Sequence, residues 1–171
     1  MNKIFQSILK ITFLHVVILL SACNISIPFQ SSDALGTLSP DAPVIVGITH
    51  VVLDHDPEKN DVFWHHASNI IDSLPAQKGY LGHKVRMQLF GNEAWTMTVW
   101  LDEESLDSFV MSEPHSEAMA HGLDAVKIAR FSRFTLNRSD LPMAWMDAEV
   151  IMNAQGRELY TQKKIKPNAT K

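Results

Sequence analysis

The stretch TVWLDEESLDSFVMSEPHSEAM, residues 98–119, decides the fold of this 171-residue chain. Its first residues end an alternating apolar run that is typical of a strand. Asp102 then predicts the start of a helix, because its carboxylate can accept hydrogen bonds from the free N–H groups of the first turn. The two glutamates that follow suit the positive end of the helix dipole. Pro114 breaks this helix and begins a second short one, which ends at Gly122.

The residues on either side of this stretch supply the other elements of the domain. Runs that alternate, or that are rich in β-branched residues, predict four strands, over 44–53, 80–90, 93–101 and 124–136. An apolar stripe at helical spacing predicts a helix over 57–74, which Pro75 ends. A last amphipathic helix is expected over 141–152.

The predicted order, β-α-β-β-α-β followed by a C-terminal helix, is the ferredoxin-like split βαβ pattern of the α+β class. We expect the helices on one face of an antiparallel sheet, which leaves the other, apolar face to be covered. A monomer rarely exposes so large an apolar patch. Pairing the sheets of two copies across a two-fold axis would cover it, so we expect a homodimer.

The N-terminal residues have the features of an export signal. Two lysines precede the apolar residues 11–20, which are too few to cross a bilayer, since a spanning helix needs about 20 residues. The sequence LSAC at 20–23 resembles a bacterial lipobox, in which residues 1–22 are a lipoprotein signal peptide and Cys23 is lipidated. The alternative is an ordinary signal peptide cut before the same cysteine. We expect a protein anchored by lipid in the cell envelope, on the periplasmic side of the outer membrane if the cell is Gram-negative.

The rest of the chain divides into three parts. Residues 23–43 hold the lipidated cysteine and, because Ser, Pro, Gly and Asp interrupt any period, a flexible tether. Residues 44–160 form the α+β domain, and 161–171 are a lysine-containing tail, more simply solvated than bound to lipid. Without the two lysines of the signal segment, the chain keeps 13 basic residues against 19 acidic ones. This balance gives no basic footprint, so we expect no nucleic-acid partner.

A candidate site follows from the predicted hairpin. If Gly91 and Asn92 form a two-residue turn, Phe90 faces Glu93 and His83 lies directly opposite Trp100. Alternate residues point the same way, so the same face also carries Val85, Met87, Thr96 and Thr98. An apolar face with a few polar tips suits a small aromatic or apolar molecule. His83 could take a proton there; the alternative is an ordinary packed pair with Trp100.

Other candidate residues of this pocket come from the helices and the first strand. His115 follows Pro114 and could face Trp100, or could simply cap the helix. His66 flanks the apolar stripe and could reach the pocket, or lie at the edge of the core. His50 alternates with the apolar residues of the first strand and could also point inward. The helix residues Phe109 and Met119 complete the expected substrate pocket.

Residues 79–97, GYLGHKVRMQLFGNEAWTM, and the opening stretch 98–119 together resemble the antibiotic biosynthesis monooxygenase-like domain of the dimeric α+β barrel superfamily. The resemblance covers about residues 44–136 and is carried by the strand that ends at Trp100, the acidic turn and the helix before His115. It implies a cofactor-independent monooxygenase that oxidises a small quinol- or polyphenol-like aromatic with O2. His83 and His115 are then the catalytic candidates. The alternative is a non-catalytic dimeric module that binds a small apolar ligand.

Neither a metal nor a haem is expected. His65 and His66 are adjacent on a helix and diverge by about 100°, and the chain has no H-E-x-x-H motif. The superfamily that the chain resembles includes haem-degrading enzymes. The resemblance implies that these have a Trp and an axial His at the positions where this chain has Phe109 and Met119. We therefore expect no cofactor.

Overall fold

The computed structural model describes residues 24–89 and 91–161. The expected signal peptide, the lipidation site Cys23 and the tail beyond Thr161 lie outside the described residues. Within them, no helix has the length and hydrophobicity needed to cross a membrane.

In the described part of the chain, six antiparallel strands form one sheet in the order β1-β3-β4-β2-β5-β6. The four predicted strands are its centre: β2 (Pro43–Leu53), β3 (Tyr80–Gln88), β4 (Glu93–Trp100) and β5 (Val126–Asn137). Two unpredicted strands, β1 (Asn24–Ser31) and β6 (Arg157–Thr161), form its edges. The α+β class and the split βαβ order are confirmed, with one extra strand on each side.

The prediction of a flexible tether over residues 23–43 is wrong for residues 24–43, which the structure describes. Residues 24–31 are β1, and a short helix, α2 (Asp33–Thr37), follows. Pro28 interrupts the local pattern, but an edge strand tolerates a proline, and the register shifts between Ile27 and Gln30 around it. The hydrogen bonds that define β1 come from β3, some 60 residues away in the chain. No local pattern reveals such a partner.

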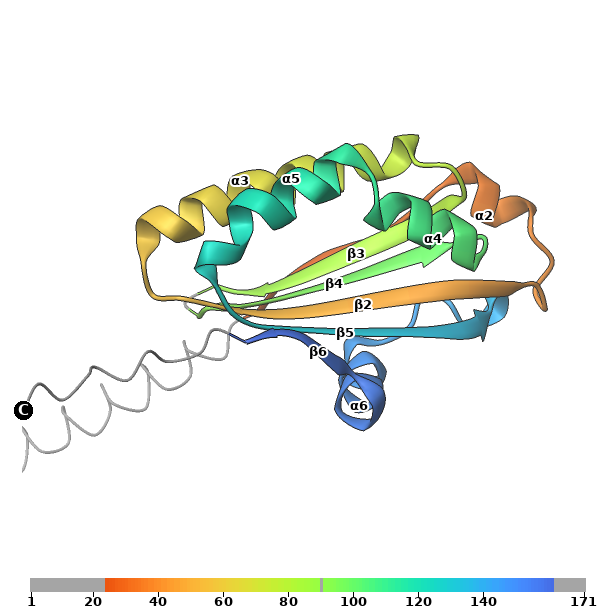
Figure 1. The fold of residues 1–171 in the computed structure, drawn as a ribbon. Coiled ribbons are helices and arrows are strands. Elements are labelled where there is room, and N and C mark those ends of the chain that lie inside the picture. The colour runs from red at the N-terminus through yellow and green to blue at the C-terminus, as the bar shows by residue number, and fades with distance from the viewer. Residues whose placement is uncertain (1–23, 90, 162–171) are drawn as a thin grey trace, which may run out of the picture.

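Helices cover both faces of the sheet (Figure 1). The helices α3 (Pro57–Ser73), α4 (Glu103–Val110) and α5 (Glu113–Gly122) lie over one face, called here the α3–α5 face. Asp56 caps α3 and Asp102 caps α4 through their carboxylates, the latter as predicted. The 3-10 turns η1 (Leu74–Ala76), η2 (Leu123–Ala125) and η3 (Arg138–Asp140) connect helices and strands.

The other face, called here the α6 face, is covered by the C-terminal helix α6 (Trp145–Gln155). Val46, Ile48, Met97 and Val99 are fully buried there, in one cluster with Met152. The expectation that this face is left open was therefore wrong. Residues 141–144 are extended rather than helical, and this crossing segment lets α6 reach back over the sheet. The homodimer, which was argued from the open face, stays a prediction on other grounds.

The predicted register of the β3–β4 hairpin was also wrong, by two residues. His83 pairs with Thr98, Val85 with Thr96 and Met87 with Ala94, so the turn is longer than Gly91–Asn92. Because the error is an even number, every side chain keeps its predicted face. Trp100 pairs with Tyr80 instead of His83.

Candidate functional site

The α3–α5 face is packed at both ends. At one end, Trp100 and Phe109 belong to a buried cluster with Tyr80. At the other end, Leu53 and Val126 are buried under the start of α3. Between the two clusters the strands carry residues that are only half-buried, namely Thr49, Thr96, Thr98 and Phe131. Helix α3, above this face, has no buried residue.

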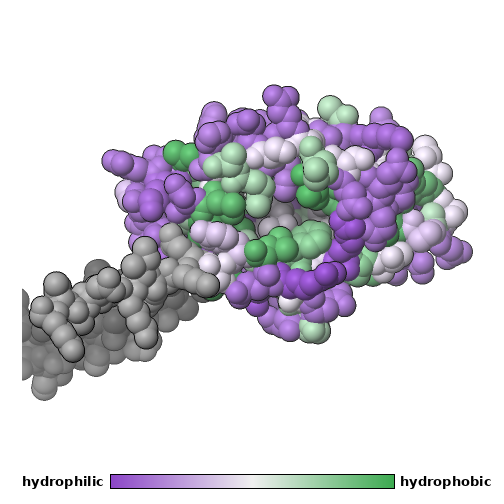
Figure 2. Space-filling view, in the orientation of Figure 1, coloured by the Kyte–Doolittle hydropathy of each residue, from purple (hydrophilic) through white to green (hydrophobic). Residues whose placement is uncertain are grey.

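Figure 2 shows a hollow on this side of the molecule, with hydrophobic side chains gathered around it. The name hollow is used here for the half-buried part of the α3–α5 face between the two clusters, whose floor is defined by Thr49, Thr96, Thr98 and Phe131. Thr98 and Phe131 come within van der Waals distance of the space above Gly47, where a Cβ would lie 3.2 Å from the Thr98 hydroxyl and 3.5 Å from the Phe131 ring. A floor of hydroxyl groups beside aromatic rings suits a small, mostly apolar molecule with a few polar atoms.

Five rings in succession line the packed end of this face. Tyr80 lies next to His83, and its ring meets Trp100 edge-on at 6.0 Å between centroids. Trp100 stacks on Phe109 at 4.9 Å, and Phe109 meets His115 at 5.4 Å. The predicted catalytic residues His83 and His115 therefore lie at the two ends of a row of aromatic rings. The structure does not bring them into direct contact.

His83 is the titratable group best placed to act at the hollow. Its ring is 7% exposed, and it shares the α3–α5 face with its cross-strand partner Thr98 on the floor. Its Nδ1 lies 2.6 Å from the hydroxyl of Tyr80, which is 7% exposed. Burial lowers the pKa of His83 below its usual value and raises that of Tyr80. Both groups are therefore neutral at neutral pH, and His83 is free to accept a proton.

Trp100 has an unused hydrogen-bond donor. The side chain is fully buried, and its Nε1 has no acceptor among the described residues. A buried indole N–H usually finds a partner, since leaving it without one costs free energy. The sequence placed Trp100 on the face of the expected pocket, opposite His83. In the structure it stacks on Phe109, and its N–H without an acceptor among the described residues is a polar group that the sequence did not indicate.

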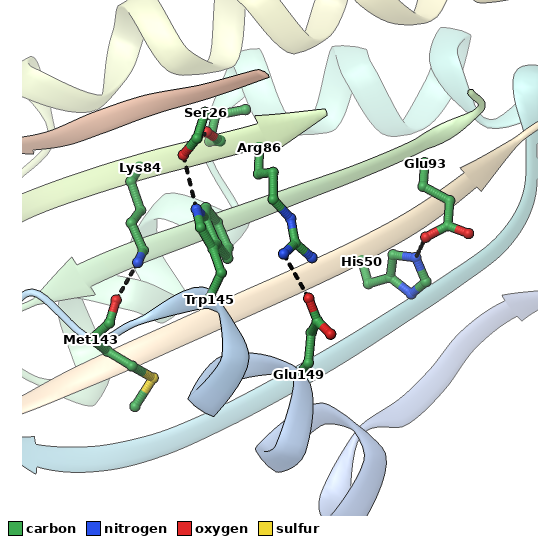
Figure 3. Close-up of polar contacts among 9 residues, drawn as sticks. Ser26, His50, Lys84, Arg86, Glu93, Met143, Trp145 and Glu149 are labelled. Atoms are coloured by element: carbon green, nitrogen blue, oxygen red, sulfur yellow. Dashed lines mark hydrogen bonds and ion pairs between the residues drawn. The ribbon is translucent and has the colours of Figure 1, made fainter. Parts of the chain in front are cut away.

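His50 was predicted in the pocket, and the structure contradicts this. It lies on the α6 face beside Glu93 (Figure 3), and its ring stacks on Trp95 at 4.0 Å. Its Nε2 donates to Glu93 at 3.2 Å, and its Nδ1 accepts from Arg130 at 2.9 Å. The physical reason is strand alternation: His50 shares a face with Val46 and Ile48, and that face turned out to be the one under α6.

The structure also separates the helix residues that were expected to converge. His66 stacks on His121 of α5 at 5.4 Å, so it belongs to the seam between α3 and α5. Met119 is 43% exposed on α5 and is not part of the site. His115 is half-buried, and burial lowers its pKa while a hydrogen bond with the backbone of Val110 opposes that shift. Its ring packs on the ring of Phe109. This contact helps to hold α5 against α4, and Phe109 stands between His115 and the other rings of the row.

Several residues of the site were missed in the sequence. Thr49 lies on β2 and Phe131 on β5, and the pairing of these strands could not be derived because the strand order was not known. Tyr80 was missed because it lies three positions before His83, which in a regular strand puts the two side chains on opposite faces. Its aromatic character at the start of a predicted strand was the only available signal.

No metal site accompanies these residues. Within residues 24–89 and 91–161, no three His, Cys, Asp or Glu side chains are grouped to hold an ion. Two surface grooves of about 340 and 320 Å³ lie elsewhere, between β1 and the segment before α6. Phe29 and Pro142 line both of them, and neither contains a histidine. They are not part of the hollow.

Solved structures with a similar arrangement of the chain include proteins described as oxygenases. SnoaB, a cofactor-independent oxygenase from Streptomyces nogalater, is 16% identical with a TM-score of 0.45, over 59% of this chain and 99% of that one. An anthrone oxidase-like protein is 16% identical with a TM-score of 0.46, over 71% of this chain and 59% of that one. A conserved protein from Methanosarcina mazei Go1 is 18% identical with a TM-score of 0.49, over 56% and 94%. No protein-family model and no curated protein sequence matches the chain. What the hollow can do therefore follows from its own side chains.

Proposed function

We propose that the chain is a cofactor-independent monooxygenase, anchored in the envelope through Cys23, that oxidises a small quinol- or polyphenol-like aromatic with O2. The observation that carries this proposal is the neutral, buried His83 held by Tyr80 on the face of the hollow. The resemblance of residues 79–119 to antibiotic biosynthesis monooxygenase-like domains supports the reaction type.

The proposed chemistry begins with a proton transfer. A phenolic or benzylic proton passes from the substrate to His83, which leaves a delocalised carbanion or phenolate. This anion gives one electron to O2, and the substrate radical and superoxide combine to a peroxide. His83 returns the proton to the outer peroxide oxygen. The second hydrogen on the same carbon then leaves as a proton, its C–H electron pair forms the carbonyl bond as the O–O bond breaks, and the departing hydroxide takes up that proton as water. Two substrate hydrogens and one O2 thus yield one carbonyl and one water.

The protein's part in this scheme is to stabilise the anion and to keep water away. The hydroxyl group of Thr96 can donate to a substrate oxygen atom, and so can that of Thr98 when it leaves its 3.5 Å hydrogen bond to the Gly47 carbonyl oxygen. The Trp100–Phe109 stack closes one end of the face to solvent.

The test is oxygen uptake by the full chain against quinols, naphthols and anthrones. We expect uptake with at least one class, and His83→Gln should lower kcat/KM by about 10²-fold or more, the usual size of a general-base contribution. The control is His121→Gln on the α3–α5 seam, which should keep full activity. Near-UV circular dichroism confirms that both variants are folded. Loss of activity to the same extent in both variants would contradict the assignment of His83.

A binding module is the second candidate, and one observation favours it. Trp100 and Phe109 are packed against each other and almost fully buried, so that end of the face is closed in the absence of a ligand. Such a protein would hold a small apolar molecule in the hollow without turnover. No oxygen uptake with any substrate class, together with tight binding of naphthol followed by Trp fluorescence, would establish this alternative.

A further inference from the structure

We propose that Phe29, Gln30 and Ser32, at and just after the end of β1, form a positioning element of the site. They hold a bulge in β3 and fix the Tyr80–His83 pair so that Nδ1 of His83 carries the proton and Nε2 is the free acceptor. The functional meaning of this arrangement rests on the proposed role of His83 as the base. The arrangement itself does not.

The bulge is what brings Tyr80 and His83 to one face. Tyr80 pairs with Trp100, and Gly82 pairs with Val99, so Leu81 is an extra residue in β3. In a regular strand, residues three apart point to opposite faces. The extra residue reverses this alternation, so that Tyr80 and His83 both lie on the α3–α5 face while Leu81 packs on the α6 face.

Ser32 supplies the hydrogen bonds that hold the bulge. Its hydroxyl lies 3.1 Å from the carbonyl oxygen of Tyr80 and 3.2 Å from that of Leu81. Its backbone N–H donates to the Leu81 carbonyl at 2.9 Å. A bulge disrupts the ladder locally, and Ser32 donates to the two carbonyl oxygens at that point.

Phe29 fits against the residue that follows the bulge. A Cβ on Gly82 would lie 2.4 Å from the Phe29 ring, so only glycine allows the ring to pack there. The N-terminal segment and the bulge are therefore shaped to each other. Loss of this segment would remove both the hydrogen bonds and the packing that keep Tyr80 in place.

Gln30 gives the Tyr80 hydroxyl a second acceptor besides Nδ1 of His83. Gln30 lies opposite His83 in the β1–β3 register, and its carbonyl oxygen is 3.4 Å from the Tyr80 hydroxyl. The hydroxyl has one proton. When it is donated to Gln30, the phenolic oxygen accepts from Nδ1–H of His83, and Nε2 keeps its lone pair. The same relay stabilises His83 after it has taken up a proton, because Nδ1–H still donates to Tyr80.

The experiment is nitrogen NMR of the full chain labelled with ¹⁵N-histidine, with His83 assigned by its absence in His83→Gln. We expect the Nδ1–H tautomer in the unchanged protein. Tyr80→Phe should shift the tautomer ratio of His83 toward Nε2–H by roughly tenfold, the factor that one hydrogen bond can supply. Ser32→Ala should shift it in the same direction, and Ser32→Thr, which keeps the hydroxyl, should restore it.

Ser31→Ala is the matched control and should leave the His83 signals unchanged. An Nε2–H tautomer in the unchanged protein would overturn the proposal, and so would His83 signals that do not respond to Ser32→Ala. Because the readout needs no turnover, it separates this proposal from the proposed function. If oxygen uptake is also found, Ser32→Ala should lower kcat and leave KM nearly unchanged.

Discussion

At the scale of single residues, His50 is a histidine whose two ring nitrogens are both engaged. Burial lowers its pKa, the hydrogen bond to Glu93 and the negative charge of Glu93 oppose this, and the positive charges of Arg130 and Arg86 add to the lowering. A proton added at Nδ1 would face the guanidinium of Arg130. The folded protein therefore favours the neutral ring.

This predicts a loss of stability in mild acid. The pKa of His50 is lower in the folded chain than the value of about 6.5 expected in the unfolded chain. As the pH falls below that value, the unfolded chain binds protons first, so the free energy of unfolding decreases until the folded pKa is passed. Above about pH 7 this contribution is fully present. We expect the urea concentration at the unfolding midpoint to decrease as the pH is lowered from 7 to 5.

His50→Asn tests the assignment. Asparagine can still accept from Arg130 but cannot be protonated, so the variant should be less stable at pH 7 and lose less stability on acidification. His121→Asn, on an exposed surface, is the control and should retain the full pH dependence. Equal pH dependence in all three proteins would assign the effect to other groups, with His83 and His115, whose pKa values burial also lowers, as the next to test.

Single residues were predictable where strand alternation alone decided their place. Trp100, Thr96, Thr98 and Val85 share the predicted face, and an even register error could not move them. Tyr80 was not predictable, because a bulge and its partner Ser32 decide its face. His50 was assigned to the correct strand, but alternation does not say which face the helices will cover.

At the scale of elements, Trp145 fastens α6 to the sheet. Its ring has the Lys84 ammonium 4.4 Å from its centroid and the Arg86 guanidinium at 5.1 Å (Figure 3). Its Nε1 donates to the Ser26 hydroxyl of β1 at 2.9 Å. Lys84 also donates to the carbonyl of Met143, and Arg86 pairs with Glu149 at 2.6 Å. One aromatic ring therefore joins β1, β3 and α6.

Removing this ring should cost far more than removing the ion pair. Trp145→Ala loses a large half-buried side chain and two cation–π contacts, for which we expect about 2–4 kcal/mol in the free energy of unfolding. Glu149→Gln loses a partly exposed ion pair, for which we expect less than about 1 kcal/mol. Urea denaturation of both variants measures the difference. Similar losses would show that charge rather than the ring holds α6 in place.

The central elements were predictable from the sequence and the edge strands were not. The strands β2 to β5 have alternating or β-branched patterns, and Asp102 marks α4 directly. β1 and β6 are short or interrupted and owe their existence to partners far away in the chain. The start of α6 at Trp145 follows from an extended segment through Pro142 that an amphipathic pattern cannot reveal.

At the scale of the whole molecule, the sheet does not need a second copy of the chain to cover its apolar face. The α6 face is buried within one chain, which removes the original reason for a homodimer. A different surface now favours one. On the outer side of α6, Met146 and Val150 lie one turn apart and are 73% and 63% exposed. Leu159 of β6, the strand that follows α6, is 61% exposed. Two large exposed apolar side chains on the outer side of one helix, with a third in the strand that follows it in the chain, suit an interface between copies.

We therefore predict a homodimer that buries this strip of α6 and β6, with the hollow of each copy left open. Light scattering after size exclusion should give twice the mass of one chain. Replacing Met146 and Val150 together by lysine should give single chains with unchanged circular dichroism, because a buried ammonium group strongly opposes association. Met111→Lys is the matched control, since Met111 is 80% exposed at the end of α4, far from this strip, and the variant should stay dimeric. A single-chain mass for the unchanged protein at micromolar concentrations would rule the dimer out and leave the strip of α6 and β6 as ordinary exposed surface.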